Sequence, residues 1–365
     1  MGFTCGIVGL PNVGKSTLFN AITAARAEVA NYPFCTIDPN VGVVAVPDRR
    51  LDRLTEIYKP GKTTPTTIEF LDIAGLVRGA SKGEGLGNQF LSHIRTVDAI
   101  AHIVRCFDDP NIVHIDGSAN PKRDIEVVET ELILKDLETV EQRHSETEKR
   151  SKSGDKKLKE EADLYVRVRD HLLSGRLARY LAIHTGEEQI WLGGLHLLTS
   201  KPVMYVCNVH EKHLSTETEY IKQVREIAAR ESAKVVIISA EVEAEIGELP
   251  ESERDSFLHE LGLQESGLNQ VVREGYGLLH LITFFTVNPK EAHAWTVRKG
   301  ATAVEAAGVI HTDFERGFIR AEIMKFADLD RLGSEPAVKE RGLLHIEGRD
   351  YVIEDGDVMF VRFNV

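Results

Sequence analysis

The sequence predicts an α/β protein with three parts: a mainly parallel sheet covered by helices on both faces, an inserted helical arm, and a small C-terminal α+β domain. Short apolar runs alternate with helical patterns over much of the chain, which is typical of parallel sheets. From about 120 to 200 this alternation stops, and after about 281 the pattern changes again. These two breaks divide the 365 residues into three parts.

The first part is a sheet domain made of residues 1–120 and 201–280. Its expected strands are the apolar runs at 3–8, 67–71, 99–104, 202–207 and 235–238. Helical patterns separate these runs, so the connections cross over the sheet and its strands are expected to be mainly parallel.

The second part, residues 121–200, is the arm. Apolar residues recur there at helical spacing among many charges, at Val128, Leu132, Leu134, Leu137 and Val140. The polar stretch KRSKSGDKKLKEEAD follows at 149–163, and a second helical segment returns through 164–181. Two long antiparallel helices joined by a basic tip explain this pattern, and the alternative for the charged stretch is a solvated loop.

The third part, residues 281–365, has the pattern of a small α+β domain. The segment 281–300 alternates like a hairpin, and 301–314 has the pattern of a short helix. The last residues, 349–365, read as terminal strands around Asp355 and Gly356.

The composition and net charge of the chain exclude some classes of protein. Apolar residues make up 42% and charged residues 28% of the chain, and the net charge of −13 argues against nonspecific binding of polyanions by the whole surface. No apolar run reaches the roughly 18 residues that a membrane-spanning helix requires, and no leader pattern begins the sequence, so a cytoplasmic protein is expected.

The four cysteines are too sparse for a disulfide framework and lack zinc-ligand spacing. Three of them, Cys5, Cys106 and Cys207, lie in apolar strand-like runs and are expected in the core. Cys35 lies in a polar segment, and we expect it to be the thiol most sensitive to oxidants.

The stretch GLPNVGKS at 9–16 matches the phosphate-binding P-loop, G-x-x-x-x-G-K-S/T. An apolar strand precedes it and a helical pattern follows it, which is the context that this motif requires. Backbone N–H groups then face the β- and γ-phosphates, Lys15 stabilises the transferring phosphoryl group, and the Ser16 hydroxyl ligates Mg²⁺. The nucleotide-binding residues expected here are Asn12, Val13, Gly14, Lys15, Ser16 and Thr17.

A second motif, D-x-x-G, follows the strand at 67–71. Asp72 is expected near Mg²⁺, and the N–H group of Gly75 near the γ-phosphate, where such a glycine senses whether that phosphate is present. Thr36, between the two motifs, is the natural second Mg²⁺ ligand; the alternative is an ordinary threonine in a surface loop.

The base is read, in GTPases of this plan, by N-K-x-D, whose Asp accepts hydrogen bonds from guanine. Here the strand at 202–207 ends in Asn208-Val209-His210-Glu211, so the Lys is missing and the acid is Glu. An Asn amide can pair with N6 and N7 of adenine, which favours ATP, although Glu211 could still reach guanine in a shifted pose. Ser239 and Ala240 occupy the position of the next base-contacting loop.

The hydrolysis machinery is incomplete in the sequence. Ras-like proteins place a Gln after D-x-x-G to orient the attacking water, and Leu76 stands there instead. We therefore expect slow intrinsic hydrolysis. His114, in the polar segment after the strand at 99–104, is the candidate mobile water-positioning or acid–base residue. Asn12 is a candidate K⁺ ligand, as in P-loops of potassium-using translation GTPases, and otherwise stabilises the turn.

Together these motifs resemble the Obg-like ATPases, a family known in bacteria as YchF. The likeness spans essentially the whole chain and includes GLPNVGKS, Y-P-F-x-T-I-x-P-N-x-G at 32–42, D-I-A-G-L-V-x-G-A-S-x-G-x-G-L-G-N-x-F at 72–90, and N-x-x-E at 208–211. The resemblance implies a P-loop ATPase of the translation-factor class with a coiled-coil arm. It also implies a C-terminal TGS domain with the ubiquitin-like β-grasp fold. By the same resemblance Asn208 contacts adenine, with the Val209 backbone beside it.

The resemblance further implies a Mg²⁺-dependent ATP switch that associates with ribosomes or RNA in translation or stress regulation. The alternatives are a GTP-dependent ribosome-assembly or translation factor, and an ATP-binding scaffold whose hydrolysis is incidental. The arm tip and the TGS-like domain are the expected contact surfaces. The basic residues of the arm tip are Lys149, Arg150, Lys152, Lys156, Lys157 and Lys159.

Overall fold

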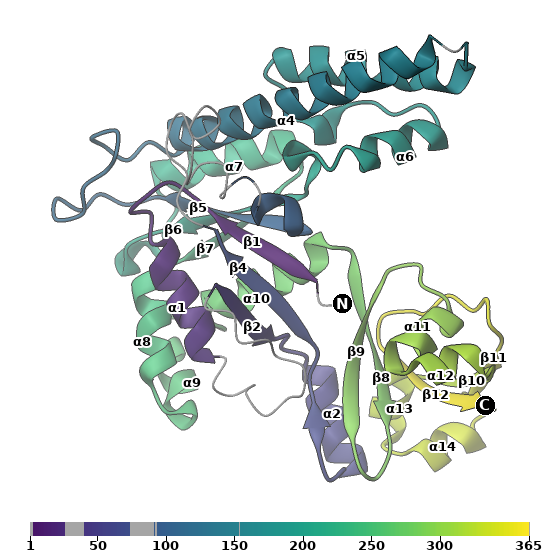
Figure 1. The fold of residues 1–365 in the computed structure, drawn as a ribbon. Helices are drawn as coiled ribbons and strands as arrows, with labels where there is room; N and C mark the ends of the chain where they lie inside the picture. The colour runs from purple at the N-terminus through teal and green to yellow at the C-terminus, as the bar shows by residue number, and fades with distance from the viewer. Residues whose placement is uncertain (1–2, 26–39, 74–90, 92, 153, 365) are drawn as a thin grey trace.

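A computed structural model of the chain describes residues 3–25, 40–73, 91, 93–152 and 154–364. Figure 1 shows a sheet with helices on both sides, an arm of long helices extending from it, and a small domain that carries the C-terminus. The predicted α/β class, the inserted arm and the C-terminal α+β domain are therefore confirmed.

The first sheet has its strands in the order β2-β4-β1-β5-β6-β7. Its strands are β1 (Thr4–Val8), β2 (Val41–Ala45), β4 (Thr67–Asp72), β5 (Ala99–Arg105), β6 (Val203–Asn208) and β7 (Lys234–Ile238). All neighbours pair in parallel except β2 and β4, which are antiparallel. The sequence did not predict β2, in which Gly42 interrupts the apolar run. Glycine is required there because a Cβ would lie 2.6 Å from the Ile22 side chain of the covering helix.

Helices cover both faces of this sheet, as predicted. They are α1 (Lys15–Ala25), α7 (Glu219–Glu231), α8 (Ala240–Glu248), α9 (Glu251–Glu260) and α10 (Gly267–Leu278). On one face α10 packs so closely that a Cβ on Gly275 would touch Met204 and Phe70. On the other face Tyr205, which alternates with Met204 along β6, reaches Glu231 of α7.

The arm contains α4 (Pro121–Ser151), α5 (Lys156–Leu173) and α6 (Gly186–Gly194), with single 3-10 turns at Ala178–Tyr180 and Leu198–Ser200. The Asn120 side chain accepts the N–H group of Arg123, which caps the start of α4. Val140, Leu164 and Val168 share one buried apolar cluster between α4 and α5. Two long helices joined by a polar tip are thus confirmed.

The returning half of the arm differs from the prediction in two ways. The helical pattern was expected to continue to residue 181, but α5 ends at Leu173. Gly175 adopts a φ of 76°, which no residue inside a right-handed helix can have, so the chain turns there. The structure also contains α6, which the sequence did not predict.

No helix in the described part of the chain combines the length and apolar character needed to cross a membrane.

Asp136 ties the end of the arm back to its root. Its carboxylate is fully buried and accepts hydrogen bonds from the backbone N–H groups of Leu198 and Thr199 and from the Thr199 hydroxyl. Burial raises the pKa of Asp136, while these three donors oppose that shift. The carboxylate thereby satisfies the first N–H groups of the Leu198–Ser200 turn and joins the last residues of the arm to α4.

The second sheet has its strands in the order β11-β10-β12-β8-β9-β3. Its strands are β3 (Thr63–Thr64), β8 (Leu281–Val287), β9 (Ala292–Arg298), β10 (Phe318–Lys325), β11 (His345–Glu347) and β12 (Asp357–Phe363). The helices that pack on it are α2 (Arg49–Tyr58), α11 (Ala303–Ile310), α12 (Thr312–Arg316), α13 (Phe326–Leu332) and α14 (Glu335–Glu340).

The C-terminal domain agrees with the sequence-based expectations in its first hairpin and differs from them in two later segments. The hairpin expected at 281–300 is confirmed as the antiparallel pair β8–β9. The helix expected at 301–314 is divided into two, because His311 between them is extended, with a φ of −162°. The expectation of strands on both sides of Asp355 is wrong in its first half, where only the isolated bridge between Val352 and Thr302 forms.

The segment 49–64 packs with the C-terminal domain, although the sequence boundaries assigned it to the sheet domain. Leu51 and Leu54 of α2 lie in the same buried cluster as Phe285 of β8. The Arg50 guanidinium lies 2.8 Å from a carboxylate oxygen of Asp355. An amphipathic helix needs an apolar surface to cover, and here that surface comes from a segment more than 200 residues away in the sequence.

Two carboxylates face each other where the arm joins the sheet domain. Tyr205 Oη lies 3.2 Å from Glu129 of α4 and 2.9 Å from Glu231 of α7, so its single proton can be donated to either carboxylate, and Arg179 lies 2.9 Å from Glu231. Burial, and secondly the negative charge of Glu231, raise the pKa of Glu129 to about 7. A proton on Glu129 therefore relieves the repulsion between the two carboxylates in the folded protein.

Glu129→Gln is expected to increase resistance to urea at pH 8 but to have little effect at pH 5. A raised pKa contributes stability that is complete below the ordinary value of 4.5 and is lost as the pH rises through 7. Glutamine stays neutral and still accepts from Tyr205, so the variant should gain about 1–2 kcal/mol at pH 8. Urea unfolding at both pH values measures this.

Glu138→Gln on the same helix serves as the control, since the Glu138 side chain is 53% exposed. A stability difference between Glu129→Gln and the parent that is the same at pH 5 and pH 8 would contradict this assignment of the proton.

Candidate nucleotide-binding site

The P-loop spans residues 9–14, between β1 and α1, at the carboxyl edge of the first sheet. Gly14 has a φ of 92°, and a Cβ there would lie 2.1 Å from the Asn208 side-chain nitrogen. A Cβ on Gly9 would lie 2.8 Å from the carbonyl oxygen of Ile103. The loop therefore needs both glycines to pass so close to β5 and β6, and this places its N–H groups at the start of α1.

Lys15 and Asp72 form an ion pair at the phosphate end of the site. Lys15 is 9% exposed, and its ammonium group contacts the Asp72 carboxylate at the end of β4. The neighbouring Ser16 and Thr17 are exposed in the first turn of α1. The Ser16 hydroxyl and the Asp72 carboxylate are the oxygen donors that Mg²⁺ prefers, so these residues fit a Mg²⁺–phosphate group. Phosphate oxygens can then replace Asp72 as the partner of Lys15.

Asn208 connects the P-loop with the loop after β7. Its amide nitrogen donates to the carbonyl oxygen of Val13 (2.9 Å), and its amide oxygen accepts the N–H group of Ala240 (2.9 Å). The side chain is buried, and its amide has a second N–H and a second lone pair beyond these two hydrogen bonds. The Ser239 hydroxyl instead caps α8 by accepting the N–H group of Val242.

A cavity of about 620 Å³ opens beside these residues and is large enough for a nucleoside. Seven of the predicted residues line it: Asn12, Gly14, Thr17, Asn208, Val209, Ser239 and Ala240. Glu211 does not line it and is exposed at the start of a 3-10 turn. The structure thus brings Asn12, Gly14 and Thr17 together with four of the predicted base residues, while Glu211 lies outside this group.

Part of the cavity wall was not predicted from the sequence. Phe107, Asp109 and Ile112, in the loop after β5, line the same cavity. The buried Arg105 donates to carbonyl oxygens of this loop, and its guanidinium carbon lies 4.7 Å from the centre of the Phe107 ring. An aromatic residue two positions after the end of a parallel strand was the available signal, because ligands of such sheets bind at the carboxyl ends of the strands.

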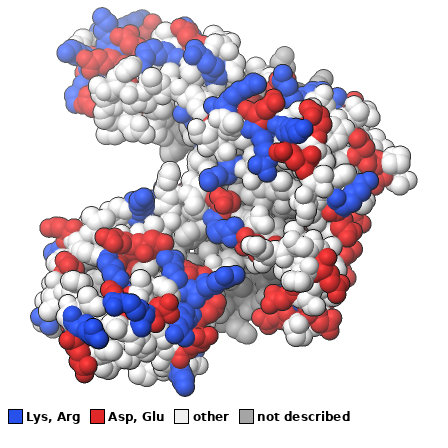
Figure 2. All heavy atoms as spheres, turned by 180° about the vertical axis from the view of Figure 1, so that it is seen from behind, with Lys and Arg blue, Asp and Glu red and all other residues white. Residues whose placement is uncertain are grey.

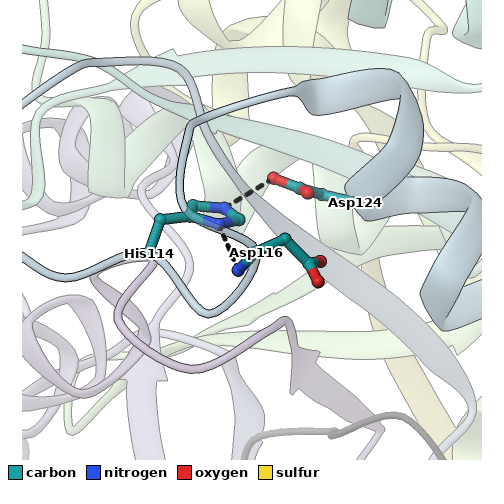
Figure 3. A group of neighbouring side chains, drawn as sticks. All are labelled: His114, Asp116 and Asp124. Carbon is teal, nitrogen blue, oxygen red and sulfur yellow. Dashed lines mark hydrogen bonds and ion pairs between the residues drawn. The ribbon is translucent and has the colours of Figure 1, made fainter.

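His114 lies in a buried position, whereas the sequence suggested a mobile loop histidine (Figure 3). The backbone N–H group of Asp116 donates to Nδ1 (3.1 Å), so the neutral ring carries its proton on Nε2, which faces Asp124 Oδ2 at 3.0 Å. Both ring nitrogens are thus occupied within the protein. In this position the ring cannot orient a water, and it would have to leave Asp124 to do so.

His114, Asp116 and Asp124 are also the residues of the described chain that cluster like metal ligands. However, the Asp124 Oδ1 atom already accepts from Arg123 Nε (3.1 Å) and Nη2 (3.0 Å). The guanidinium also lies 3.6 Å from Asp116. Since a cation is already paired with both carboxylates, this cluster reads as an anchored turn.

Several predicted residues lie outside the described residues, namely Cys35, Thr36, Gly75 and Leu76. Their predicted roles therefore stay predictions. The other three cysteines, Cys5, Cys106 and Cys207, are buried as predicted. Burial raises the pKa of the Cys5 thiol to about 12, which keeps it protonated and unreactive.

P-loop nucleotide hydrolases have a parallel sheet whose strands end in a phosphate-binding loop, in an acidic residue and in an amide side chain at the base end of the site. The chain is a protein of this class. Residues 4–136 match the family model described as "50S ribosome-binding GTPase". Residues 281–364 match the model of the YchF GTPase C-terminal domain, described as a "protein of unknown function". The chain belongs to the YchF family, because relatives of that name are more than half identical to it over its full length.

Two of these relatives are both named "Ribosome-binding ATPase YchF". The protein of Escherichia coli O157:H7 is 55% identical over 365 residues, and that of Bacillus subtilis (strain 168) is 54% identical over 367 residues; 100% of each chain is covered. A solved structure, that of the Schizosaccharomyces pombe YchF GTPase, superposes with a TM-score of 0.89 at 38% identity. The match covers 99% of this chain and 98% of that one.

Proposed function

We propose that this protein is a Mg²⁺-dependent ATPase that hydrolyses ATP slowly and switches its affinity for ribosomes between its ATP and ADP states. The names of its relatives support ATP hydrolysis and ribosome binding. A matching family model and a similar solved structure are instead called GTPases, so the choice between adenine and guanine depends on the residues of the site. Leu76 in place of a water-orienting Gln supports slow turnover.

The assignment of ATP depends on one observation, the arrangement of residues at the base end of the cavity. Asn208 is held there by Val13 and Ala240, Val209 stands where guanine readers carry Lys, and Glu211 lies outside the cavity. An amide offers a donor and an acceptor that match adenine N7 and N6, with Ser239 and Ala240 alongside. The Phe107 ring on the cavity wall provides a face on which a base can stack.

Val209→Lys combined with Glu211→Asp is expected to raise the affinity for GTP relative to ATP by about tenfold. In the N-K-x-D arrangement the Asp carboxylate accepts from the N1–H and 2-amino groups of guanine, so the double variant must also turn residue 211 toward the cavity. A charge-assisted hydrogen bond of this kind is worth roughly 1.5–3 kcal/mol. Calorimetric titration of ATP and GTP into parent and variant measures the ratio. His210→Ala is the matched control, because His210 also lines the cavity but offers guanine no such acceptor pair.

An unchanged ATP-to-GTP ratio in the double variant would mean that the base is read elsewhere. A parent that prefers GTP would favour the alternative of a GTP-dependent ribosome-assembly or translation factor. ATP binding without any turnover would favour the scaffold.

Two cations belong to this proposal. Ser16, Asp72 and Thr36 supply the oxygen ligands for Mg²⁺, which neutralises charge on the phosphates when it is bound. The Asn12 amide nitrogen donates to the carbonyl oxygen of Val113 (3.0 Å), which leaves its amide oxygen for K⁺. Equal hydrolysis rates in KCl and NaCl at constant ionic strength would remove the proposal for K⁺.

The arm and the TGS-like domain are the proposed ribosome or RNA contacts. Both project from the sheet domain on the same side, with a hollow between them, and carry mixed charges (Figure 2). Lys157 of the arm tip pairs with Glu187 of α6 (2.7 Å), and Lys156 lies 3.5 Å from Glu160. The tip is therefore less basic than its sequence suggested, although both lysines remain largely exposed.

Replacing Lys149, Lys152 and Lys159 with glutamine is expected to flatten the salt dependence of ribosome binding. Each phosphate contact that is lost lowers the slope of log affinity against log salt by about 1. Cosedimentation over a salt series, with ATP and with ADP, measures that slope. The control replaces three exposed basic residues of the sheet domain, Lys222, Arg225 and Lys234, with glutamine. If the two triple variants behave alike, the contact lies on the C-terminal domain instead.

A further inference from the structure

Arg105 is a buried cation beside the nucleotide cavity. It ends β5, is 3% exposed, and donates to three backbone carbonyl oxygens of one loop. These are the oxygens of Phe107 (3.1 Å), Asp109 (3.3 Å) and Ile112 (3.0 Å). No ion pair joins Arg105 to a carboxylate of the described residues.

A buried guanidinium without a carboxylate is costly, because burial removes its hydration and only neutral dipoles replace it. Such a group is rarely found in a protein interior unless its shape is needed to bind several acceptors at once. Arginine has five N–H donors in a planar fork, which can hold several carbonyls of one loop at once. A lysine ammonium presents a single charged centre and cannot span the same three oxygens.

The loop that Arg105 holds forms part of the nucleotide cavity. Phe107, Asp109 and Ile112, whose carbonyls Arg105 binds, are also the residues of this loop that line the cavity. The guanidinium carbon lies 4.7 Å from the centre of the Phe107 ring, so it contacts the ring as well as the backbone. The next residue, Val113, accepts the side-chain N–H group of Asn12 in the P-loop.

We propose that Arg105 is a positioning residue for the base: it fixes the loop and the Phe107 ring at the orientation in which the ring stacks on adenine. This inference rests on the proposed assignment of Phe107 to the base. Preorganisation of this kind increases affinity by avoiding the cost of ordering the loop during binding. The effect is confined to the base, since the phosphates are held by the P-loop.

The test compares ATP with inorganic tripolyphosphate, which has the phosphates but no base. Arg105→Lys is expected to lower the affinity for Mg²⁺–ATP about tenfold by calorimetry and to leave that for Mg²⁺–tripolyphosphate unchanged. Arg179→Lys is the matched control, since Arg179 is a second largely buried arginine that contacts the ring of Tyr180, away from the cavity. If Arg105→Lys does not fold, Arg105→Gln, which removes the buried charge, replaces it.

A double-mutant cycle with Phe107→Ala separates this inference from the proposed function. If Arg105 acts through Phe107, the second substitution adds little to the loss caused by the first. Equal losses for ATP and tripolyphosphate, or fully additive losses, overturn the positioning role. A Phe107→Ala variant that binds ATP as the parent does would instead contradict the base-stacking assignment itself.

Discussion

Lys15→Ala is expected to lower the ATP hydrolysis rate at least about 10²- to 10³-fold, the loss typical for one preorganised group that stabilises transition-state charge. The Lys15 ammonium lies at the start of α1, nearly excluded from water, and pairs with Asp72. When phosphates occupy the loop, this charge faces the β- and γ-phosphate oxygens. Single-turnover hydrolysis and calorimetric titration of ATP separate the effect on chemistry from that on binding.

Lys201→Ala is the matched control for Lys15→Ala. Lys201 is also a partly buried lysine, but its ammonium group donates to the carbonyl oxygens of Arg95 and Val97, away from the P-loop. Its loss should lower thermal stability and leave the shift in Tm caused by Mg²⁺–ATP intact, whereas Lys15→Ala should reduce that shift. Turnover by Lys15→Ala close to that of the parent would mean that the loop does not hold the reacting phosphates.

His114→Ala is expected to lower the turnover number about 100-fold while ATP affinity changes little. General acid–base or water-positioning groups typically contribute 10²- to 10⁴-fold, and a residue that acts only in the transition state affects turnover alone. In the structure the ring is held by Asp124 and by the N–H group of Asp116. For either role the ring would have to leave these partners. Steady-state kinetics with independent ATP titration measures both quantities.

His171→Ala is the matched control, because His171 is a similarly buried histidine whose Nε2 contacts the carbonyl oxygen of Leu177 in the arm. It should affect stability without affecting turnover. Asp124→Asn adds a second test: if the ring leaves Asp124 in order to act, weakening that contact should not reduce the rate. Equal turnover by His114→Ala and the parent would leave His114 as an anchor of the turn.

The phosphate half of the site was predictable because its chemistry is local. Residues 9–16 carry the loop, the lysine and the hydroxyl in one stretch, and the apolar runs before and after them identify a strand and a helix. Asp72 and Asn208 were predictable for a related reason: each ends a strand, and parallel strands bring such residues to one edge. The strands and the long arm helices followed from their apolar periodicity.

The base half and the domain boundary could be seen only in three dimensions. The position of Glu211 outside the cavity, the closure of the cavity wall by Phe107, and the buried turn around His114 depend on how loops from different strands meet. Likewise, α2 joins the C-terminal sheet because its apolar face fits there. A sequence pattern specifies that a side chain will be buried, but not which distant side chain it will contact.

The sequence by itself therefore determined the class of fold, the three parts and the residues of the phosphate loop, since each depends on neighbours within a few turns of chain. The tertiary structure alone decided that Arg105 holds the loop beside the base, that Glu129 meets Glu231, and that the His114 ring is engaged by Asp124. These contacts depend on packing between elements far apart in sequence, where burial changes the energy of every charge involved.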